Sequence, residues 1–356
     1  MEGITREKIG SLREKLAKYP KVQLSNPTPI EHLRNVSDDL GLEVIVSRLD
    51  KSGPGYGGHY SHALEYVFGE IVNGSYDSVV HGGPSQSNQN LLIAAACARY
   101  GLKTHLVLRK KLSVDEMNIG NIFLDQLCGA DIKWVTAEMG PELDREKEAR
   151  YREILREGKE KPYLFERQRV AFLSCLGMLD MFLGIYEQLD ESDKMPSRIY
   201  LTGCGPTHSG ILLGSKLIAP EMSIVGVTPL HWDAKSIVSN EFNMTAGNLG
   251  EQISITPQEV VNYGDYVGKD YGIPTKEANN AIKYFANREG IFFDPVYTGK
   301  MAACFLDHAR NNQIPKDSRV LIIHSGGTPL LLLYAPQVYG SLGLSLTPPK
   351  NAEKGS

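Results

Sequence analysis

Side chains able to transfer protons cluster directly after a glycine-rich loop. The loop is GPGYGG (53–58), and His59, Tyr60 and His62 follow it. Apolar residues then recur at helical spacing, at Leu64, Val67, Phe68 and Ile71. A loop of this kind presents backbone N–H groups and the first helical side chains to a ligand. Because imidazole titrates near neutral pH and a phenol can exchange a proton, the pattern indicates acid/base chemistry at this helix entrance.

A second polar group lies in TGCGPTHSG (202–210), which follows an apolar strand and opens a helix. Its glycines permit close backbone approach, and its donors stand at a helix N-terminus, where negative charge is favoured. We expect a cradle for a phosphate or carboxylate, formed by Gly203, Cys204, Gly205, Thr207, His208, Ser209 and Gly210. A tight turn with an N-cap is the alternative. A dinucleotide-binding loop fits less well, because His208 replaces the third glycine of G-x-G-x-x-G.

HGGPSQSNQ (81–89) has a similar composition at another strand-to-helix junction. Ser87, Asn88 and Gln89 stand at the helix entrance, where side chains and free N–H groups could hold a carboxylate. Capping alone would explain one of them but not the whole polar run. These residues and His81, at the end of the preceding strand, are therefore candidate substrate-binding residues.

Two loop tyrosines stand just before helices, Tyr271 in DYGIPT and Tyr297 in DPVYTG. Each could supply a catalytic phenol or simply pack at the surface. No metal site is predicted: His59 and His62 have a spacing that permits a shared ion, but no third ligand lies near them in the sequence.

Positioning these loops requires strands that alternate with helices. Apolar, β-rich runs predict strands at 42–47, 77–82, 103–109, 132–137, 198–203, 223–228 and 319–325. Helical patterns lie between them at 60–73, 87–101, 118–129, 167–189, 207–217, 275–289, 296–312 and 328–340. The alternation predicts an α/β fold with parallel sheets covered by helices, and ligands beyond the carboxyl ends of the strands.

The chain divides into two predicted domains. A charge-dense segment (139–161) reads as a surface helix that returns the chain from one domain to the other. We expect a large domain made of 1–58 plus 165–356, with 59–164 inserted as a smaller domain, and the site in the cleft between them.

Bulk composition limits the class of protein. The 356 residues carry a formal net charge of −4, which argues against a nucleic-acid or anionic-membrane partner. Five scattered cysteines without CxxC spacing indicate reduced thiols and a cytoplasmic setting. The N-terminus shows no secretory signal, and we expect no apolar run of membrane-spanning length.

Six ordered segments together resemble the D-cysteine desulfhydrase and 1-aminocyclopropane-1-carboxylate (ACC) deaminase family. NPTPIEHLRNVSDDLG (26–41) is similar to its APTPLE…LSDYLG segment, and SRLD (47–50) and GGHYSHALEY (57–66) stand where it has KRDD and GGNKxRKLEY. SQSNQ (85–89), GCGPTHSG (203–210), DPVYTGK (294–300) and HSGGTP (324–329) are similar to its IQSN(Q/H), GSAGTHAG, DPVYTGK and HTGG motifs. The resemblance runs almost end to end.

This resemblance implies a tryptophan-synthase-β-like, fold-type-II enzyme of pyridoxal phosphate (PLP) and a homodimer. It places the substrate carboxylate at Ser87, Asn88 and Gln89 and the cofactor phosphate on the 203–210 turn. It makes Tyr271 and Tyr297 active-site tyrosines, and it puts Thr298 or Ser325 near the pyridine nitrogen.

The chain departs from the family at the residue that matters most for the cofactor. The lysine of GGNK, which forms the Schiff base in the family, is replaced by Tyr60, and its neighbours have become His59, His62 and Ala63. A phenol cannot form an imine, so an internal aldimine is impossible at this position. PLP, if bound, would be held non-covalently or as a substrate imine.

Three hypotheses remain open. The first is a lyase-like enzyme that uses acid/base chemistry (elimination, cyclisation or isomerisation) on a small amino-acid-like or phosphorylated substrate. The second is a non-catalytic protein that binds PLP, an amino acid or phosphate. The third is PLP-dependent desulfhydrase or deaminase chemistry through a displaced lysine such as Lys51, since Lys300 already belongs to the family pattern.

Overall fold

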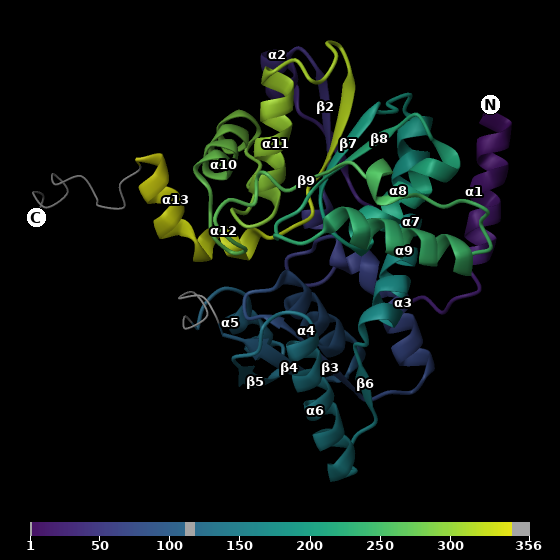
Figure 1. The fold of residues 1–356 in the computed structure, drawn as a ribbon, viewed down its shortest axis with the longest axis vertical. Helices are drawn as coiled ribbons and strands as arrows, with labels where there is room; N and C mark the ends of the chain where they lie inside the picture. Colours follow the sequence, from purple (N-terminus) through teal and green to yellow (C-terminus); the bar gives the residue numbers. More distant parts are fainter. Residues whose placement is uncertain (1, 111–117, 344–356) are drawn as a thin grey trace, which may run out of the picture.

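The strands form two separate sheets, which lie one above the other in Figure 1. A computed structural model describes residues 2–110 and 118–343. The larger sheet has the order β1-β2-β10-β7-β8-β9 and the smaller one β5-β4-β3-β6. All pairs are parallel except β1 with β2. The predicted α/β class with parallel sheets is thereby confirmed.

The strand bounds follow the apolar runs of the sequence. The larger sheet contains β1 (Ile30–His32), β2 (Glu43–Ser47), β7 (Arg198–Thr202), β8 (Ser223–Val227), β9 (Asn262–Tyr263) and β10 (Arg319–Ile323). The smaller sheet contains β3 (Ser78–Pro84), β4 (Lys103–Arg109), β5 (Asp131–Val135) and β6 (Pro162–Leu164). The seven predicted strands are present, and the sequence missed only the short β1, β6 and β9. Central strands such as β10 are apolar at successive positions because helices cover both faces.

Helices cover each face of the larger sheet. On one face α8 (Pro206–Ile218) contacts the strands, and α7 (Arg167–Glu191), α9 (Ala234–Asn248) and α1 (Glu2–Leu16) pack around it in the same apolar core. The other packs against α2 (Arg34–Leu40), α10 (Lys276–Glu289) and α11 (Thr298–Arg310). The predicted helix over 328–340 is two helices, α12 (Thr328–Leu333) and α13 (Ala335–Leu342). Short 3₁₀ turns occur at η1 (Leu49–Lys51) and η3 (Pro257–Glu259).

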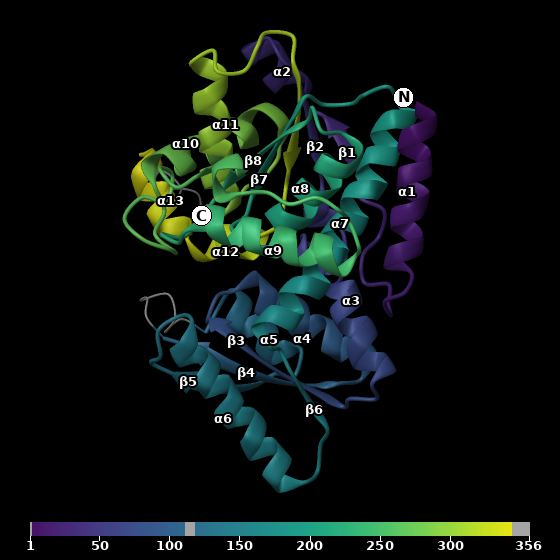
Figure 2. The ribbon, with the colours of Figure 1, turned by 45° about the vertical axis from the view of Figure 1, so that its right-hand side comes forward.

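The smaller sheet carries α3 (Tyr60–Asn73), α4 (Asn88–Tyr100), α5 (Asn121–Leu127) and α6 (Pro141–Glu157). α3 lies at the junction of the two sheets and packs on α7 (Figure 2). The contact is close: a Cβ added to Gly177 would lie 2.2 Å from the His62 carbonyl oxygen. The apolar core is therefore continuous across the junction, and the predicted domain boundaries stay a prediction.

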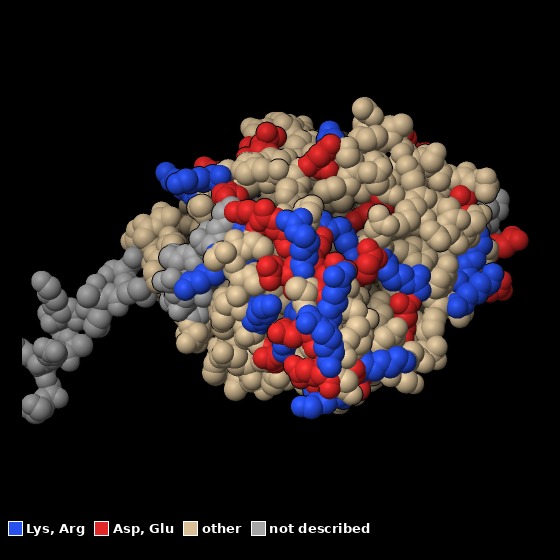
Figure 3. Space-filling model, turned by 60° about the horizontal axis from the view of Figure 1, so that its bottom comes forward, with Lys and Arg blue, Asp and Glu red and all other residues tan. Residues whose placement is uncertain are grey.

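α6 is the helix predicted for the charge-dense segment (139–161), but it packs on β3, β4 and β6 of the smaller sheet and does not itself lead the chain back to the larger one. Charged side chains of both signs are interspersed on the face seen from the small-sheet end (Figure 3). On α6 they form ion pairs such as Arg152 with Glu148 and Arg150 with Glu153 at 2.9 Å. Leu143 and Lys147 of the same helix are buried.

α7 bears on the expectation that the chain has no apolar run of membrane-spanning length. By length and composition, α7 is the one helix in the described part of the chain that could cross a membrane. However, 78% of its apolar window is buried inside the structure. That degree of burial is ordinary for the central helix of a folded domain.

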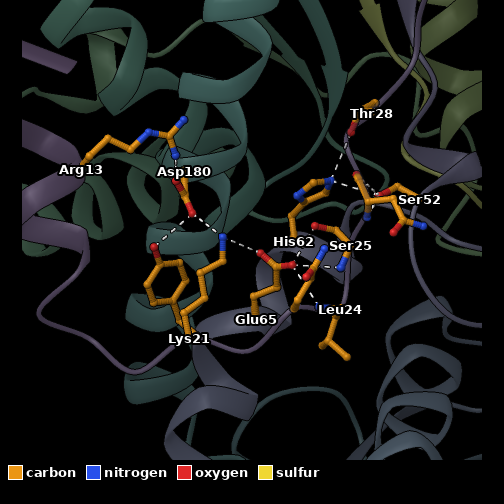
Figure 4. Close-up of polar contacts among 12 residues, drawn as sticks. Arg13, Lys21, Leu24, Ser25, Thr28, Ser52, His62, Glu65 and Asp180 are labelled. Carbon is orange, nitrogen blue, oxygen red and sulfur yellow. Dashed lines mark hydrogen bonds and ion pairs between the residues drawn. The ribbon is translucent and has the colours of Figure 1, made fainter. Parts of the chain in front are cut away.

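A network of ion pairs ties the N-terminal segment to α3 and α7 (Figure 4). Asp180 of α7 accepts from Arg13, from the Lys21 Nζ at 2.7 Å and from the Tyr66 hydroxyl at 3.1 Å. The Lys21 Nζ also lies 3.0 Å from Glu65. Burial lowers the pKa of Lys21, but these carboxylates outweigh it and leave the pKa above its ordinary value.

An Asp180→Asn substitution is expected to lower the free energy of unfolding by about 1–3 kcal/mol. It removes a buried carboxylate charge that the buried Tyr66 hydroxyl and the part-exposed Arg13 and Lys21 share as acceptor. Urea unfolding followed by circular dichroism measures this. Asp190→Asn is the matched control: Asp190 lies 3.9 Å from Arg6 in an exposed pair, which is worth at most about 1 kcal/mol. Equal losses in both variants would show that the network does not stabilise the fold.

Candidate active site

A cavity of about 620 Å³ lies between the two sheets. On the small-sheet side it is lined by the end of β3, the start of α4 and part of α6. On the other side it is lined by the turn after β7, by α9 and by loop residues including Tyr271 and Tyr297. The start of α3 closes the junction. The cavity thus lies beyond the carboxyl ends of β3 and β7, where parallel sheets bind ligands.

Two consecutive glycines position the start of α3. Gly57 and Gly58 have φ values of +65° and +122°, which residues with a Cβ rarely adopt. A Cβ on Gly57 would lie 2.6 Å from the Asp50 carbonyl oxygen, and one on Gly58 would lie 3.0 Å from that of Ser325. The turn thereby brings the next two side chains, His59 and Tyr60, to the cavity wall.

His59 is held as a neutral imidazole. Its Nδ1 lies 3.1 Å from the Ser325 carbonyl oxygen, which can only accept, so Nδ1 carries the proton and Nε2 keeps a free lone pair. Burial lowers the pKa of His59 to about 4, and the hydrogen bond to Ser325 offsets only part of this. At neutral pH the ring can therefore accept a proton, and its centroid lies 4.0 Å from that of Tyr60.

Three tyrosines bring their phenols to the same cavity. Tyr271 and Tyr297 hydrogen-bond through their hydroxyls, with ring centroids 5.9 Å apart. The Tyr60 hydroxyl has no hydrogen-bond partner among residues 2–110 and 118–343. Burial raises the pKa of all three above the ordinary tyrosine value. They are therefore proton donors at neutral pH.

Asp294 fixes the loop that carries Tyr297. Its carboxylate accepts from the backbone N–H groups of Val296 and Tyr297, both at 2.8 Å, and from the Thr298 hydroxyl at 2.7 Å. Thr298 is fully buried in this cap and does not line the cavity. Its expected place beside a cofactor ring is therefore not what the structure shows, whereas Ser325 does line the cavity.

The α4 entrance supplies amide and hydroxyl groups to the cavity. Ser87, Asn88, Gln89 and His81 all line it. The Ser87 side chain caps α4 by accepting from the Gln89 N–H at 3.2 Å, and the Asn88 Oδ1 accepts from Asn121 at 2.9 Å. Among residues 2–110 and 118–343, no hydrogen bond uses the hydroxyl proton of Ser87 or the side-chain N–H groups of Asn88 and Gln89, so these donors can serve a ligand. Burial lowers the pKa of His81 to about 3, so its ring is neutral.

The turn after β7 contributes only its first part to the cavity. Gly203, Cys204, Gly205 and Thr207 line it, whereas His208, Ser209 and Gly210 do not. The His208 ring packs against β8, where a Cβ on Gly226 would lie 2.4 Å from its Nδ1, and that Nδ1 lies 3.1 Å from the Asn262 amide. Gly210 is a packing residue, because a Cβ there would lie 2.5 Å from Met178 of α7. The predicted cradle is therefore shorter than expected.

His62 lies on the opposite side of α3 from Tyr60. Its Nε2 is 3.2 Å from the Thr28 hydroxyl and 3.3 Å from that of Ser52 (Figure 4). It lines a separate cavity of about 480 Å³ next to the Asp180 network. The expectation that His62 acts beside Tyr60 is thus wrong in its placement.

The lysines of the described chain that could replace an amine at position 60 are poorly placed to hold an aldehyde. Lys51 is half exposed and its Nζ lies 2.7 Å from Glu31, outside the cavity. The Lys300 Nζ is buried and donates to the Val267 carbonyl at 2.8 Å. Lys147 is the one lysine among the described residues that line the cavity, and its Nζ lies 2.7 Å from the Asp144 carboxylate.

Sequence reasoning missed one carboxyl group in the cavity wall. Glu241 of α9 lies at the turn after β7 and accepts from the Ser209 hydroxyl at 3.0 Å. Burial raises the pKa of Glu241 to about 7, and the hydrogen bond from Ser209 opposes this. The sequence signal for Glu241 was an acidic residue between Val238 and Phe242, two apolar residues at helical spacing. We did not predict a helix there, so this signal was not used.

The chain matches the family of pyridoxal-phosphate dependent enzymes over residues 22–326, and it belongs to that family. Within it, the chain is 31% identical to a putative ACC deaminase of Pyrococcus abyssi, over 91% of this chain and 96% of that one. It is 28% identical to D-cysteine desulfhydrase of Salmonella typhi, over 91% of this chain and 98% of that one. A solved structure of an ACC deaminase homologue has a TM-score of 0.82 and 30% identity, covering 93% and 99% of the two chains. The fold is therefore PLP fold type II.

The residues at two points of the cavity do not fit a lysine-bound PLP. Tyr60 at the cavity wall offers no amine, and the Lys147 amine is paired with the Asp144 carboxylate. At the expected phosphate position, a Cβ on Gly205 would lie 3.6 Å from both Glu241 carboxyl oxygens. An acidic group there opposes a phosphate dianion.

Proposed function

We propose that this protein is an ACC deaminase/D-cysteine desulfhydrase-like enzyme that works by acid/base chemistry, without an internal aldimine. Its substrate is a small amino-acid-like or phosphorylated molecule in the cavity between the sheets. The observation that carries the proposal is the pairing, at the cavity wall, of a neutral His59 with a phenol at position 60. A phenol has no amine with which to form an imine.

The side chains support distinct roles in such a reaction. A substrate carboxylate would be held at the α4 entrance by Ser87, Asn88 and Gln89. The His59 Nε2 would remove a proton from the substrate, and the Tyr60 hydroxyl would donate one to the leaving or receiving atom. The Tyr271–Tyr297 pair offers a further donor to a developing negative charge. Elimination, cyclisation and isomerisation each require one proton removed and one delivered.

One observation favours a second candidate, a non-catalytic binding protein. An imidazole with a pKa of about 4 is a weak base, and the pKa values of the three phenols lie above their ordinary value. Both shifts slow proton transfer at neutral pH. A cavity that only binds an amino acid or PLP would tolerate these pKa shifts, because binding alone needs no proton transfer.

PLP-free protein is expected to convert at least one member of a panel of small amino acids, or to exchange its Cα proton for deuterium in D₂O. Proton NMR measures conversion of D-cysteine, ACC, serine and O-phosphoserine, and it measures Cα exchange for all of these except ACC, whose Cα carries no proton. Conversion or exchange that starts only when PLP is added would contradict the proposal. Binding of a panel member without conversion or exchange would favour the second candidate.

A further inference from the structure

Glu241 lies over the turn at which the family resemblance places a phosphate group. Its carboxyl oxygens lie 3.6 Å from the position a Cβ would take on Gly205, the residue that opens α8. The Ser209 hydroxyl, one turn along that helix, lies 3.0 Å from the Glu241 Oε2. The carboxyl group thus lies beside the first turn of α8, close to the helix N-terminus at which an anion would be favoured.

No basic side chain balances Glu241 in the described part of the chain. Its ion pairs and hydrogen bonds there comprise only the bond from Ser209. The titratable groups that interact with it are Cys175 of α7 and Cys204 of the turn. Burial raises the pKa of both thiols, so they remain uncharged at neutral pH. His231 and Asp270 line other parts of the same cavity wall.

The hydrogen-bond arrangement suits a carboxyl group that changes its protonation state. The Ser209 hydroxyl lies 3.0 Å from both the Gly205 carbonyl and Glu241, but it has one proton. A protonated Glu241 can donate to Ser209, which then donates to Gly205. An ionised Glu241 takes the serine proton itself.

We propose that Glu241 is a specificity-determining residue that excludes phosphate esters from this turn and selects substrates without a phosphate group. The inference rests on the proposed function and narrows its substrate class. A carboxylate and a phosphate dianion at this distance repel each other strongly in a partly buried site. Phosphate binding then requires Glu241 to be protonated first. Small amino acids place no negatively charged group at the turn after β7, because their single carboxylate is held at the α4 entrance.

Sulfate binding tests the inference without any assay of activity. Sulfate keeps its double charge between pH 5.5 and 8.5, so its own titration does not enter. At pH 8.5 we expect Glu241→Gln to bind sulfate at least about tenfold more tightly than the unchanged protein, measured by calorimetry. As the pH falls through about 7, the affinity of the unchanged protein should rise toward that of the variant, because Glu241 becomes protonated.

Glu221→Gln is the matched control, because it removes the same charge from an exposed position beyond the other end of α8. It should leave sulfate affinity unchanged. Equal affinity of the unchanged protein and Glu241→Gln at pH 8.5 would overturn the inference. If Glu241→Gln does not fold, the pH series on the unchanged protein decides, and a flat profile would overturn it. Either failure leaves the roles of His59 and Tyr60 untouched, since neither residue contributes to this readout.

Discussion

Tyr60→Phe is expected to lower kcat by about 10²–10⁴-fold, the range that a general acid contributes. The substitution removes one hydroxyl and keeps the ring that packs beside His59 at a centroid distance of 4.0 Å. Because that hydroxyl has no hydrogen-bond partner among residues 2–110 and 118–343, its loss should cost the fold little. The rate to measure is conversion, or Cα deuterium exchange, of the substrate found with PLP-free protein.

Tyr56→Phe provides the control for Tyr60→Phe. Tyr56 belongs to the same glycine-rich loop but is 52% exposed and lies outside the cavity lining. Its variant should keep the full rate. A Tyr60→Phe protein as fast as the Tyr56→Phe protein would remove the phenol from the mechanism.

Tyr60→Lys combined with Glu241→Gln is expected to retain PLP covalently after borohydride reduction. The first change introduces an amine at the cavity wall, and the second removes the carboxylate that lies beside the turn after β7. We expect Tyr60→Lys alone to bind PLP at least about tenfold more weakly than the double variant, because Glu241 still repels the phosphate. Absorbance and mass of the reduced protein report the adduct.

Tyr56→Lys with Glu241→Gln is the matched control, since it places the new amine on the exposed part of the loop. It should gain no adduct at residue 56 beyond surface labelling. If neither double variant is labelled at the new lysine, residue 60 does not stand where the family's amine acts.

The sequence predicted the sheets well because buried parallel strands have a simple signature. Strands such as β7 and β10 are apolar at successive positions, and small residues follow them where helices begin. Those two features were enough to place residues 203–205, Ser87 and Ser325 at one cavity. The short β6 and β9 carry no such run, and their pairing depends on neighbours that are distant in the sequence.

Side-chain direction was harder to predict than the presence of an element. His62 follows Tyr60 by two residues, and at 3.6 residues per turn this places it about 200° around α3. It therefore faces Thr28 and Ser52 and not the cavity. His208 and Thr298 were assigned to a ligand because of their motifs, but side chains of the fold itself, Asn262 and Asp294, hydrogen-bond to them.

Glu241 was missed because α9 was not recognised as a helix. Its start is marked by Asp233, whose side chain accepts from the Ser236 N–H at 3.1 Å, a common N-cap arrangement. The interior of α9 is polar at several positions, so its apolar periodicity is weak. That Glu241 faces the turn depends on how α9 packs against α7 and α8, which no local pattern reveals.

Mass spectrometry of the unchanged protein after incubation with PLP and borohydride distinguishes acid/base chemistry at Tyr60 from a lysine-bound cofactor. We predict no pyridoxyl group on any peptide that lines the cavity between the sheets, at PLP concentrations where the Tyr60→Lys, Glu241→Gln protein is labelled. A stoichiometric pyridoxyl group on Lys147, Lys51 or Lys300 would show that another lysine holds the cofactor. The acid/base account built on Tyr60 and His59 would then be contradicted.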